Sequence, residues 1–485
     1  MPQLIPYQIM LNSNFVGRTF ELEKLARIDK AKRASILVVY GKRRIGKTEL
    51  LEQAFRKRNV LKFEGIEGKP QSYQINQVIL QFSKYLQDIF LSRLKLNSWI
   101  EVLELLAQYL SQGKWTLYFE ELQWLSAYKS DFVTALKYVW DNKLRHNPNL
   151  LIILCGSSPS FMLNKIIHSK ALYNRSAQEI FLQEFDLAET QLFFQKSKRT
   201  PSEIMDAYLA VGGVPEYLKY LDEESSVFLA LCKHAFTPGG LLVTEYEKIF
   251  TSSLGKNQNY KKIIEFLSKQ KFTTRNDLQK SLKISSGGTL SGLLIDLELS
   301  GFIVKYTPFN LNENSLLARY HILDQYLQFY FKFIKPLRRR IIDGEFKNNP
   351  TSALKYDSYR KWQGYAFERF CRKYHKLIAK ILGFDAVSYR YGTFFNRNLN
   401  QRDQNFQIDL IYERKDKVYT ICEIKYLDSQ VNTQIIREFE TKLHLFPNKQ
   451  NYTLHKVLIT INGATKDLLA KGYFDRIITL SDFFT

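Results

Sequence analysis

The chain has 485 residues, which is more than one hydrophobic core usually serves and fits about two to four domains. Hydrophobic residues make up 45%, and neither internal repeats nor low-complexity tracts occur, which excludes a largely disordered chain or a repeat array. Lys and Arg number 70 against 48 Asp and Glu, a net charge of +22. Such a surplus favours association with polyanions, chiefly nucleic acid, and a solvated basic surface explains it equally well.

Cysteine usage and hydropathy bear on the compartment. The four cysteines have no CxxC spacing, so neither a zinc site nor a disulfide framework is expected, and the cytoplasm fits best; they are Cys155, Cys232, Cys371 and Cys422. No apolar run approaches the roughly 20 residues that span a bilayer. The first residues, MPQLIPYQIMLNSNF, lack the basic and apolar regions of a signal peptide. We therefore expect no membrane partner.

The first part of the chain alternates helical segments with short apolar runs. A turn and a helix are predicted over 15–30, a helix begins near Gly46, and a helix-rich stretch covers about 74–112. The apolar runs predict buried strands; they are ILVVY (36–40), WTLYFEEL (115–122) and LLIILCGSS (150–158). This alternation indicates an α/β domain with a parallel sheet.

The middle of the chain is helical from about 187 to 250, and GGVPEYL (212–218) interrupts the pattern. Beyond Gly255, NYKKIIEFLSK, TTRNDLQKSL and GGTLSGLLIDLELSG predict three short helices. FIVKYTPF and ARYHILD predict two strands after them, and Thr274 suits a helix cap. Three helices and a hairpin describe a winged helix.

The C-terminal part, about 316–485, predicts a mixed α/β unit. Residues 362–382 predict a helix, QIDLIYER and VYTICEIKY predict two strands around the turn KDK, and HKVLITING predicts a further strand. The expected domains are 1–186, 187–252, 253–315 and 316–485.

A glycine-rich loop follows the first predicted strand. GKRRIGKT fits GxxxxGK[ST], in which glycines let backbone N–H groups approach a phosphate chain and the following helix adds its dipole. Lys47 is expected to reach the β- and γ-phosphates and Thr48 to hold Mg²⁺. The sequence therefore predicts an ATP–Mg²⁺ site formed by Gly41, Lys42, Arg43, Arg44, Ile45, Gly46, Lys47, Thr48 and Glu49.

Polar residues end the second and third buried strands. Glu120, where such ATPases usually carry Asp, is expected to organise Mg²⁺, and Glu121 to polarise the attacking water. Ser157, with Ser158 beside it, can sense the γ-phosphate or simply form a turn. Arg175 can stabilise the γ-phosphate charge from its own or a neighbouring subunit, or can be a solvated surface residue.

These motifs together resemble the archaeal-type ATPase family, allied to AAA+ and STAND ATPases. The matching segments are FVGRTFELEKL, YGKRRIGKTEL, LYFEELQWL, ILCGSSPSFM, LYNRSAQEIFL and GGVPEYL. The resemblance implies that Phe15, Val16 and Arg18 help surround the adenine. It also implies a helical lid after the core, a winged helix and a C-terminal nuclease-like domain.

The C-terminal hairpin carries Asp409, Glu423 and Lys425 as D-x13-E-x-K. Strand side chains alternate, so Glu423 and Lys425 point the same way, with Asp409 one hairpin strand away. Asp409 and Glu423 can hold one divalent cation while Lys425 activates water, and Glu368 can join them. This resembles the PD-(D/E)XK nuclease core, with Ile408 in place of its Pro. The fold also serves as a binding platform, so cleavage and binding both stay open.

The basic surplus has two candidate locations. The expected recognition helix, GGTLSGLLIDLELSG, is poor in basic residues, and its Asp296 and Glu298 would repel phosphate. KFIKPLRRRIIDGEFK (332–347) is a basic cluster that either grips phosphates or forms a solvated linker.

The leading hypothesis is an ATPase coupled to DNA binding or processing, with a nuclease-like C-terminal site. The alternative is an ATP-dependent signalling switch whose C-terminal domain binds a protein or DNA partner without cleavage. ATP and Mg²⁺ are the expected cofactors, and a homo-oligomer fits either function.

Overall fold

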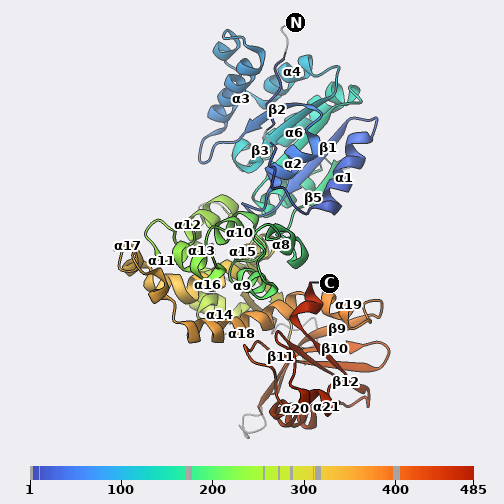
Figure 1. The fold of residues 1–485 in the computed structure, drawn as a ribbon. Helices are drawn as coiled ribbons and strands as arrows, with labels where there is room; N and C mark the ends of the chain where they lie inside the picture. Colours follow the sequence, from blue (N-terminus) through green and yellow to red (C-terminus); the bar gives the residue numbers. More distant parts are fainter. Residues whose placement is uncertain are drawn as a thin grey trace. The chain divides into compact units, whose positions relative to one another are not determined.

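The computed structural model describes residues 4–9, 11–170, 172, 177–254, 257–270, 273–283, 288–309, 311, 318–396 and 405–484 (Figure 1). The chain divides into two compact units. Unit 1 consists of Met1–Glu184, Glu247–Asn257 and Ile295–Ser300, and unit 2 of Phe185–Tyr246, Gln258–Leu294 and Gly301–Thr485.

Unit 1 is built on a parallel five-stranded sheet with the order β2-β3-β4-β1-β5. The strands are β1 (Ser35–Tyr40), β2 (Asn59–Glu64), β3 (Trp115–Glu120), β4 (Leu151–Gly156) and β5 (Ala177–Phe181). The three strands predicted from apolar runs are confirmed as β1, β3 and β4. The edge strands β2 and β5 were not predicted, because NVLKFE and AQEIF include charged residues and form no continuous apolar run.

Helices cover both faces of this sheet. Alternate residues of β1 point to opposite sides, so each set packs against a different group of helices. Ile36, Val38 and Tyr40 join a large apolar cluster that includes residues of α3, α4 and α6. Leu37 and Val39 join a second cluster with α1 and α2. The helices are α1 (Thr19–Lys30), α2 (Lys47–Phe55), α3 (Gln71–Leu86), α4 (Trp99–Tyr109), α5 (Leu122–Leu125), α6 (Asp131–Asn142) and α7 (Pro159–Phe161).

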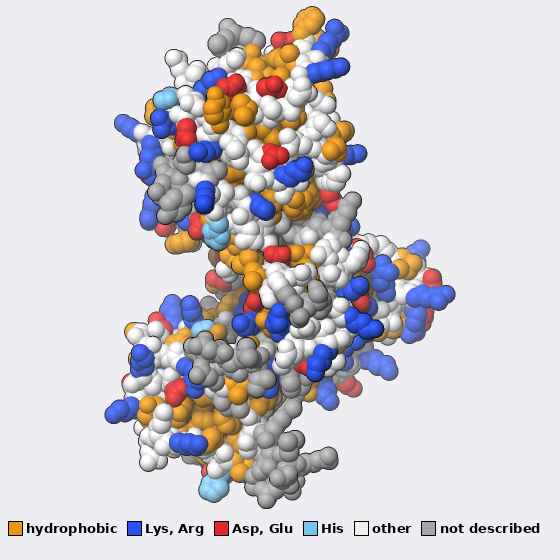
Figure 2. Space-filling view, turned by 180° about the vertical axis from the view of Figure 1, so that it is seen from behind, with side chains coloured by type: hydrophobic (Ala, Val, Ile, Leu, Met, Phe, Trp, Pro, Cys, Tyr) orange, Lys and Arg blue, Asp and Glu red, His pale blue; other side chains and the backbone are white. Residues whose placement is uncertain are grey.

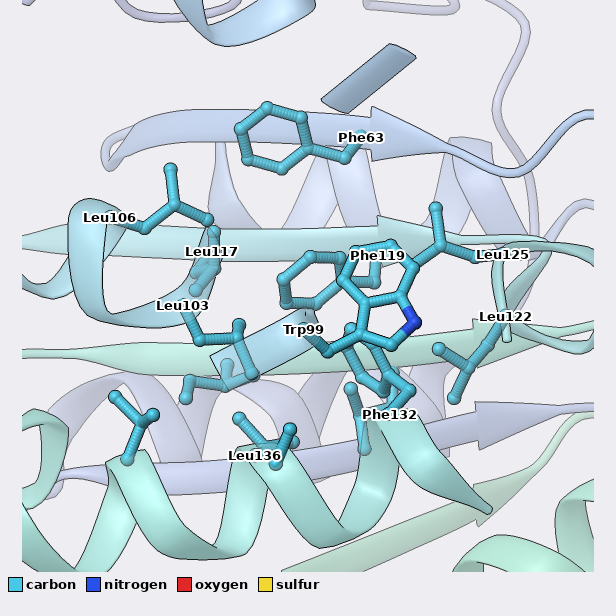
Figure 3. Close-up of a cluster of buried hydrophobic side chains, with 14 of the residues drawn as sticks. Phe63, Trp99, Leu103, Leu106, Leu117, Phe119, Leu122, Leu125, Phe132 and Leu136 are labelled. Atoms are coloured by element: carbon cyan, nitrogen blue, oxygen red, sulfur yellow. The ribbon is translucent and has the colours of Figure 1, made fainter. Parts of the chain in front are cut away.

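Several aromatic side chains pack against one another in the larger of the two apolar clusters. Figure 3 shows Trp99 of α4, Phe119 of β3 and Phe132 of α6 together. The rings of Trp99 and Phe132 have centroids 5.0 Å apart, and those of Phe119 and Phe132 are 4.9 Å apart, both edge-to-face. Such pairs add about 0.5–1.5 kcal/mol beyond the burial of their area. This packing fixes the strand that ends at Glu120.

Unit 2 begins with helices and a small antiparallel sheet. The helices are α8 (Leu187–Phe193), α9 (Pro201–Val211), α10 (Pro215–Leu221), α11 (Val227–Phe236), α12 (Leu241–Leu254), α13 (Gln258–Ser268), α14 (Arg275–Leu282) and α15 (Gly288–Leu299), of which α12 and α15 extend into unit 1. The sheet has the order β6-β8-β7, from β6 (Thr273–Thr274), β7 (Ile303–Tyr306) and β8 (Arg319–Ile322). Thr274 caps α14 by accepting from the N–H of Asp277. The winged-helix assignment of α13 to β8 stays a prediction.

The C-terminal part of unit 2 contains a mixed sheet with the order β13-β12-β11-β10-β9. β9, β10 and β11 are antiparallel, whereas β11, β12 and β13 are parallel. The elements are α16 (Gln325–Phe329), α17 (Arg338–Ile342), α18 (Tyr356–Lys373), α19 (His375–Ile381), β9 (Tyr389–Asn396), β10 (Phe406–Arg414), β11 (Val418–Lys425), α20 (Gln434–Leu445), β12 (Thr453–Thr460), α21 (Lys466–Ala470) and β13 (Arg476–Ile478).

Two details differ from the sequence-based expectation. The single helix predicted over 362–382 is two helices, because Tyr374 leaves helical dihedrals with φ −97° and ψ 28°. The strand predicted over 115–122 ends at Glu120, where Glu121 adopts a left-handed conformation with φ 51°. The predicted α/β class is confirmed: unit 1 is built on a parallel sheet, and a mixed sheet forms the C-terminal part. The nuclease-like assignment of that sheet stays a prediction.

Hydropathy gives a limited result for membrane spans. Across the described ranges, no single helix is long and apolar enough to cross a bilayer. The pair Val227–Phe236 and Leu241–Phe250, bent by 64° between its halves, meets the criterion jointly on length and composition alone.

Candidate functional site

The loop between β1 and α2 depends on two glycines. Gly41 has φ 157°, and a Cβ there would lie 2.2 Å from the backbone oxygen of Leu182, which follows β5. Gly46 precedes α2 with φ 83°, a left-handed conformation that favours glycine. The backbone therefore curls tightly around the start of α2, as a loop that cradles phosphates requires.

Lys47 lies at the first position of α2 and points back over the loop. Its Nζ donates to the backbone oxygens of Gly41 and Lys42 at 3.2 Å and 2.8 Å. The ammonium, the loop N–H groups and the helix N-terminus thus concentrate positive potential at one place. These residues fit the phosphates of a nucleotide.

The segment before α1 supports the loop from the other side. Arg18 is only 4% exposed, and its Nη2 donates to the backbone oxygen of Ile45 at 3.0 Å. Phe15 packs against the cluster that α1, α2 and β1 share, and Val16 is half-buried beside it. Arg18 therefore supports the phosphate loop, and a contact of Phe15, Val16 and Arg18 with adenine stays a prediction. Arg43 and Arg44 are half-buried in the loop, and Ile45 fills the core beneath it.

Glu120 ends β3 in contact with the phosphate loop. The hydroxyl of Thr48 donates to its Oε1, as does the hydroxyl of Tyr118 at 2.9 Å. Lys62 of β2 forms an ion pair with Oε2 at 2.7 Å. Burial alone would lower the pKa of Lys62, but the carboxylates of Glu120 and Glu52 raise it above its ordinary value. Thr48 and Glu120 thus provide the hard oxygen ligands that suit Mg²⁺.

Glu121 belongs to a compact polar network at the same edge of the sheet. Its Oε2 accepts from the hydroxyl of Ser157 at 2.6 Å and from Nε2 of Gln123 at 2.6 Å. Gln123 also donates to Oγ of Ser157 at 3.0 Å. Because β4 lies between β3 and β1, Ser157 stands between Glu121 and the strand that leads to the phosphate loop. The network fixes the carboxylate that the sequence predicts as the water-polarising group.

Two neighbouring predictions have different outcomes. Ser158 turns away from this network and donates to the backbone oxygen of Ser253 at 2.7 Å. Arg175 lies outside the described residues. Lys62 and Gln123 were not predicted. Lys62 lies on an unpredicted edge strand, and Gln123 reaches Ser157 from the short helix that follows the left-handed Glu121.

A second polar cluster lies on the mixed sheet of unit 2. The register of β10 and β11 pairs Leu410 with Cys422, which places Asp409 opposite Glu423. A bulge interrupts β10 between Ile408 and Ile411, and both of these side chains join the same apolar cluster. The extra residue interrupts the regular alternation of side chains at Asp409, a common feature beside functional sites.

Lysines surround the buried carboxylate of Glu423, which is 1% exposed. Lys442 of α20 donates to both of its oxygens at 2.9 Å and 2.6 Å, and Lys425 lies 3.2 Å from Oε1. Lys442 was not among the predicted residues, because its position on a separate helix gives no sequence signal. The predicted pair of Glu423 and Lys425 is brought together, with a second ammonium beside it.

Asp409 is 8% exposed and accepts from Gln407 at 3.0 Å and from the N–H of Ile424 at 3.2 Å. Burial and the nearby carboxylate of Glu368 raise the pKa of Asp409. Burial and the carboxylate of Asp409 likewise raise the pKa of Glu423. Carboxyl groups whose pKa is shifted by burial and by nearby charges are common at functional sites.

The carboxylates form an incomplete metal cage. Among the residues that the structure describes, no group of three His, Cys, Asp or Glu side chains is placed to hold a metal ion. Glu368 pairs with Arg372 at 3.5 Å on its own helix, α18. Asp409 and Glu423 could supply two oxygen ligands to a divalent cation, and water and a phosphate would have to supply the others.

Three of the six basic residues of 332–347 form ion pairs with acids. Lys335 lies 2.9 Å from Glu265, Arg339 lies 4.0 Å from Asp343, and Arg340 pairs with Glu345. Figure 2 shows basic and acidic side chains mixed on the projection that α17 forms. This pairing favours the solvated alternative over a phosphate grip.

Comparisons with known proteins place the first site in context. Residues 15–221 match a family described as an ATPase domain predominantly from Archaea. An uncharacterized protein of Methanocaldococcus jannaschii is 24% identical over 436 residues, 85% of this chain and 88% of that protein. Among solved structures, a Walker-type ATPase of Pyrococcus abyssi is 19% identical and covers 67% of this chain and 98% of its own, with a TM-score of 0.49. The ORC2 protein of Aeropyrum pernix is 11% identical and covers 70% and 98%, with a TM-score of 0.45.

Proposed function

We propose that this chain, whose residues 15–221 match an ATPase domain family predominantly from Archaea, is a Mg²⁺-dependent ATP hydrolase whose nucleotide state controls nucleic-acid binding or processing by unit 2. The observation that carries the hydrolase proposal is the network of Glu121, Gln123 and Ser157 beside the contact of Thr48 with Glu120. It supplies a fixed carboxylate next to a Mg²⁺-ligand pair and a phosphate loop.

Each residue has a distinct role in this proposal. Lys47 and the loop N–H groups would hold the phosphates, and Thr48 and Glu120 would hold Mg²⁺, which neutralises charge on the leaving phosphates when bound. Glu121 would orient a water and accept its proton. Ser157 and Gln123 hold the Glu121 carboxylate in one position. The carboxylate is therefore already oriented when the water binds.

ATP turnover in the presence of Mg²⁺ tests the proposal. We expect Lys47→Ala to lose nucleotide binding, whereas Glu121→Gln should keep binding and lose turnover by about 100-fold or more. Glu104→Gln is the matched control, because Glu104 is a partly exposed acid paired with Lys143 at 3.1 Å elsewhere in unit 1. Unchanged turnover in Glu121→Gln, or no nucleotide binding by the wild-type chain, contradicts the hydrolase assignment.

The nucleic-acid part of the proposal rests on unit 2 and on the net charge of +22. Asp409 and Glu423 face each other across a hairpin with two lysines, which suits hydrolysis of a phosphodiester by water with a divalent cation. Plasmid nicking with Mg²⁺ or Mn²⁺ tests it, with Lys425→Ala expected to be inactive. A cytoplasmic location and self-assembly belong to the same proposal.

A second candidate is an ATP-dependent signalling switch with a non-catalytic C-terminal sheet. The contact of Lys442 with both oxygens of Glu423 favours it, since an ammonium already satisfies the carboxylate. In this case neither wild type nor Lys425→Ala nicks DNA, while ATP still changes the affinity for a protein or DNA partner. Nicking by the wild type that Lys425→Ala abolishes excludes this candidate.

A further inference from the structure

Unit 2 contains a cavity of about 1470 Å³ that neither the phosphate loop nor the carboxylate pair explains. Its walls come from β7 and the residues after it, from α18, and from β9 and β10. The wall after β7 is tied to the sheet, because the N–H of Phe309 donates to the backbone oxygen of Thr393 at 3.2 Å. The cavity exceeds the roughly 300–1,000 Å³ of pockets for one drug-sized ligand, so it suits an extended occupant.

The lining of the cavity is strongly basic. Of the described residues that form it, nine are Lys or Arg and two are Asp or Glu. Low-dielectric walls of one charge sign focus the field and raise the local concentration of the opposite charge. The cavity is therefore built for an anion, and its two acids are Glu368 and Asp409 of the carboxylate cluster.

Arg369 of α18 gives the cavity a specific anion contact. Its Nε and Nη2 are buried and have no hydrogen-bond partner among the described residues. The guanidinium carbon lies 6.0 Å from the ring centroid of Trp362, an uncharged side chain that cannot form an ion pair with it. Burial, together with the neighbouring Arg372, lowers the pKa of Arg369 to about 10. Buried guanidinium nitrogens that donate no hydrogen bond are costly, and the charge of Glu368 nearby offsets only part of that cost, so an anionic ligand that accepts from them would be stabilised.

Aromatic rings alternate with the basic residues of the lining. Tyr365 is 50% exposed and Tyr391 is 42% exposed, although both lie on the cavity wall. Phe331, Phe395 and Phe406 line it as well. Exposed rings next to phosphate-binding cations are the arrangement that binds unpaired bases, since each base stacks on a ring while its phosphate meets a cation. The bases of a duplex are already stacked on one another and offer no such face.

We propose that this cavity binds a single-stranded nucleic-acid segment, with Arg369 contacting a backbone phosphate and Tyr365 and Tyr391 stacking on bases. Asp409 lies in the same wall, so a bound strand passes beside the carboxylate pair. The inference deepens the proposed function, because it names the nucleic acid on which unit 2 acts. Strand binding and ATP binding use different units, so each is measurable without the other.

Fluorescence anisotropy with a labelled oligothymidylate, and with a labelled hairpin duplex of equal charge, tests the proposal on the full chain. We expect the single strand to bind at least tenfold more tightly than the duplex. Arg369→Gln should weaken strand binding about tenfold and lower the salt slope by about 0.7, the share of one phosphate contact on a single strand. Tyr365→Ala should weaken it about tenfold through one lost stacking contact. Arg339→Gln is the matched control, since it removes the same charge from a side chain that is 96% exposed on α17.

A thermal unfolding measurement separates a ligand contact from a structural role. Arg369→Gln should leave the free chain as stable as wild type or more so, because two buried nitrogens that donate no hydrogen bond are removed. Reduced stability, strand binding unaffected by Arg369→Gln, or equal affinity for duplex and single strand would each overturn the proposal. Binding of labelled ATP by a chain that binds no oligonucleotide also overturns it. Oligonucleotide binding without ATP binding instead contradicts the proposed hydrolase and leaves the cavity assignment standing.

Discussion

Replacing Asp409 by Asn should stabilise the protein. Asp409 lies opposite Glu423 on neighbouring antiparallel strands, and both side chains are buried. Like charges directly opposite one another destabilise a sheet, and such cross-strand pairs are worth about 0.2–1 kcal/mol. Asn fits the same partners, because its oxygen can accept from the N–H of Ile424 while the amide of Gln407 turns to accept from its nitrogen. We expect a rise in melting temperature of up to about 4 °C.

The pH dependence gives the sharper test of this reasoning. Burial and Glu368 raise the pKa of Asp409 in the folded chain above its ordinary value of 3.8. The folded state therefore holds this proton more tightly than the unfolded state, and the free energy of unfolding falls as pH rises through the raised pKa. Asp409→Asn removes this pH-dependent loss of stability. The gain in stability over the wild type should be largest at neutral pH. It should disappear below the ordinary pKa of 3.8, where the wild-type carboxyl is protonated in both the folded and the unfolded state.

Melting curves of the wild type and Asp409→Asn across this pH range measure the effect. Glu413→Gln is the control on the same strand, because Glu413 forms an ion pair with Arg390 at 3.0 Å and its loss should be neutral or slightly destabilising. A lower melting temperature for Asp409→Asn at neutral pH would refute the reasoning, since it would mean that the charged carboxylate supports the fold.

Three further predictions concern unit 1. Ser157→Ala should lower ATP turnover about tenfold with unchanged nucleotide affinity, because one charge-assisted hydrogen bond to the Glu121 carboxylate, the proposed base, is lost; a loss of affinity alone in titrations with labelled ATP would contradict it. Gly41→Ala should destabilise unit 1 by about 1–3 kcal/mol in urea unfolding, because its Cβ would meet the oxygen of Leu182 at 2.2 Å; unchanged urea unfolding would mean that the loop shifts to make room. Phe119→Ala should cost about 3–5 kcal/mol in the same measurement, because its ring is fully buried between neighbouring aromatic rings; a cost below 1 kcal/mol would mean that the cluster closes around the gap.

Features that consecutive residues build could be predicted from the amino-acid sequence. The loop Gly41–Thr48 could be placed because a buried strand, two glycines and a helix start follow one another directly. Glu120 and Glu121 could be placed at a strand end for the same reason. The turn KDK and the alternation of strand side chains also predicted that Glu423 and Lys425 share a face, and the two side chains are 3.2 Å apart.

The groups from distant parts of the chain that contact these residues became visible only in the folded structure. Lys442 reaches Glu423 across 19 positions of the chain, and Lys62 reaches Glu120 because an edge strand with no apolar run pairs with β3. The bulge at Asp409 and the unpaired guanidinium of Arg369 likewise leave no local pattern. Strand pairing and helix packing set these contacts, and both depend on residues far apart in the sequence, so spacing and periodicity carry no trace of them.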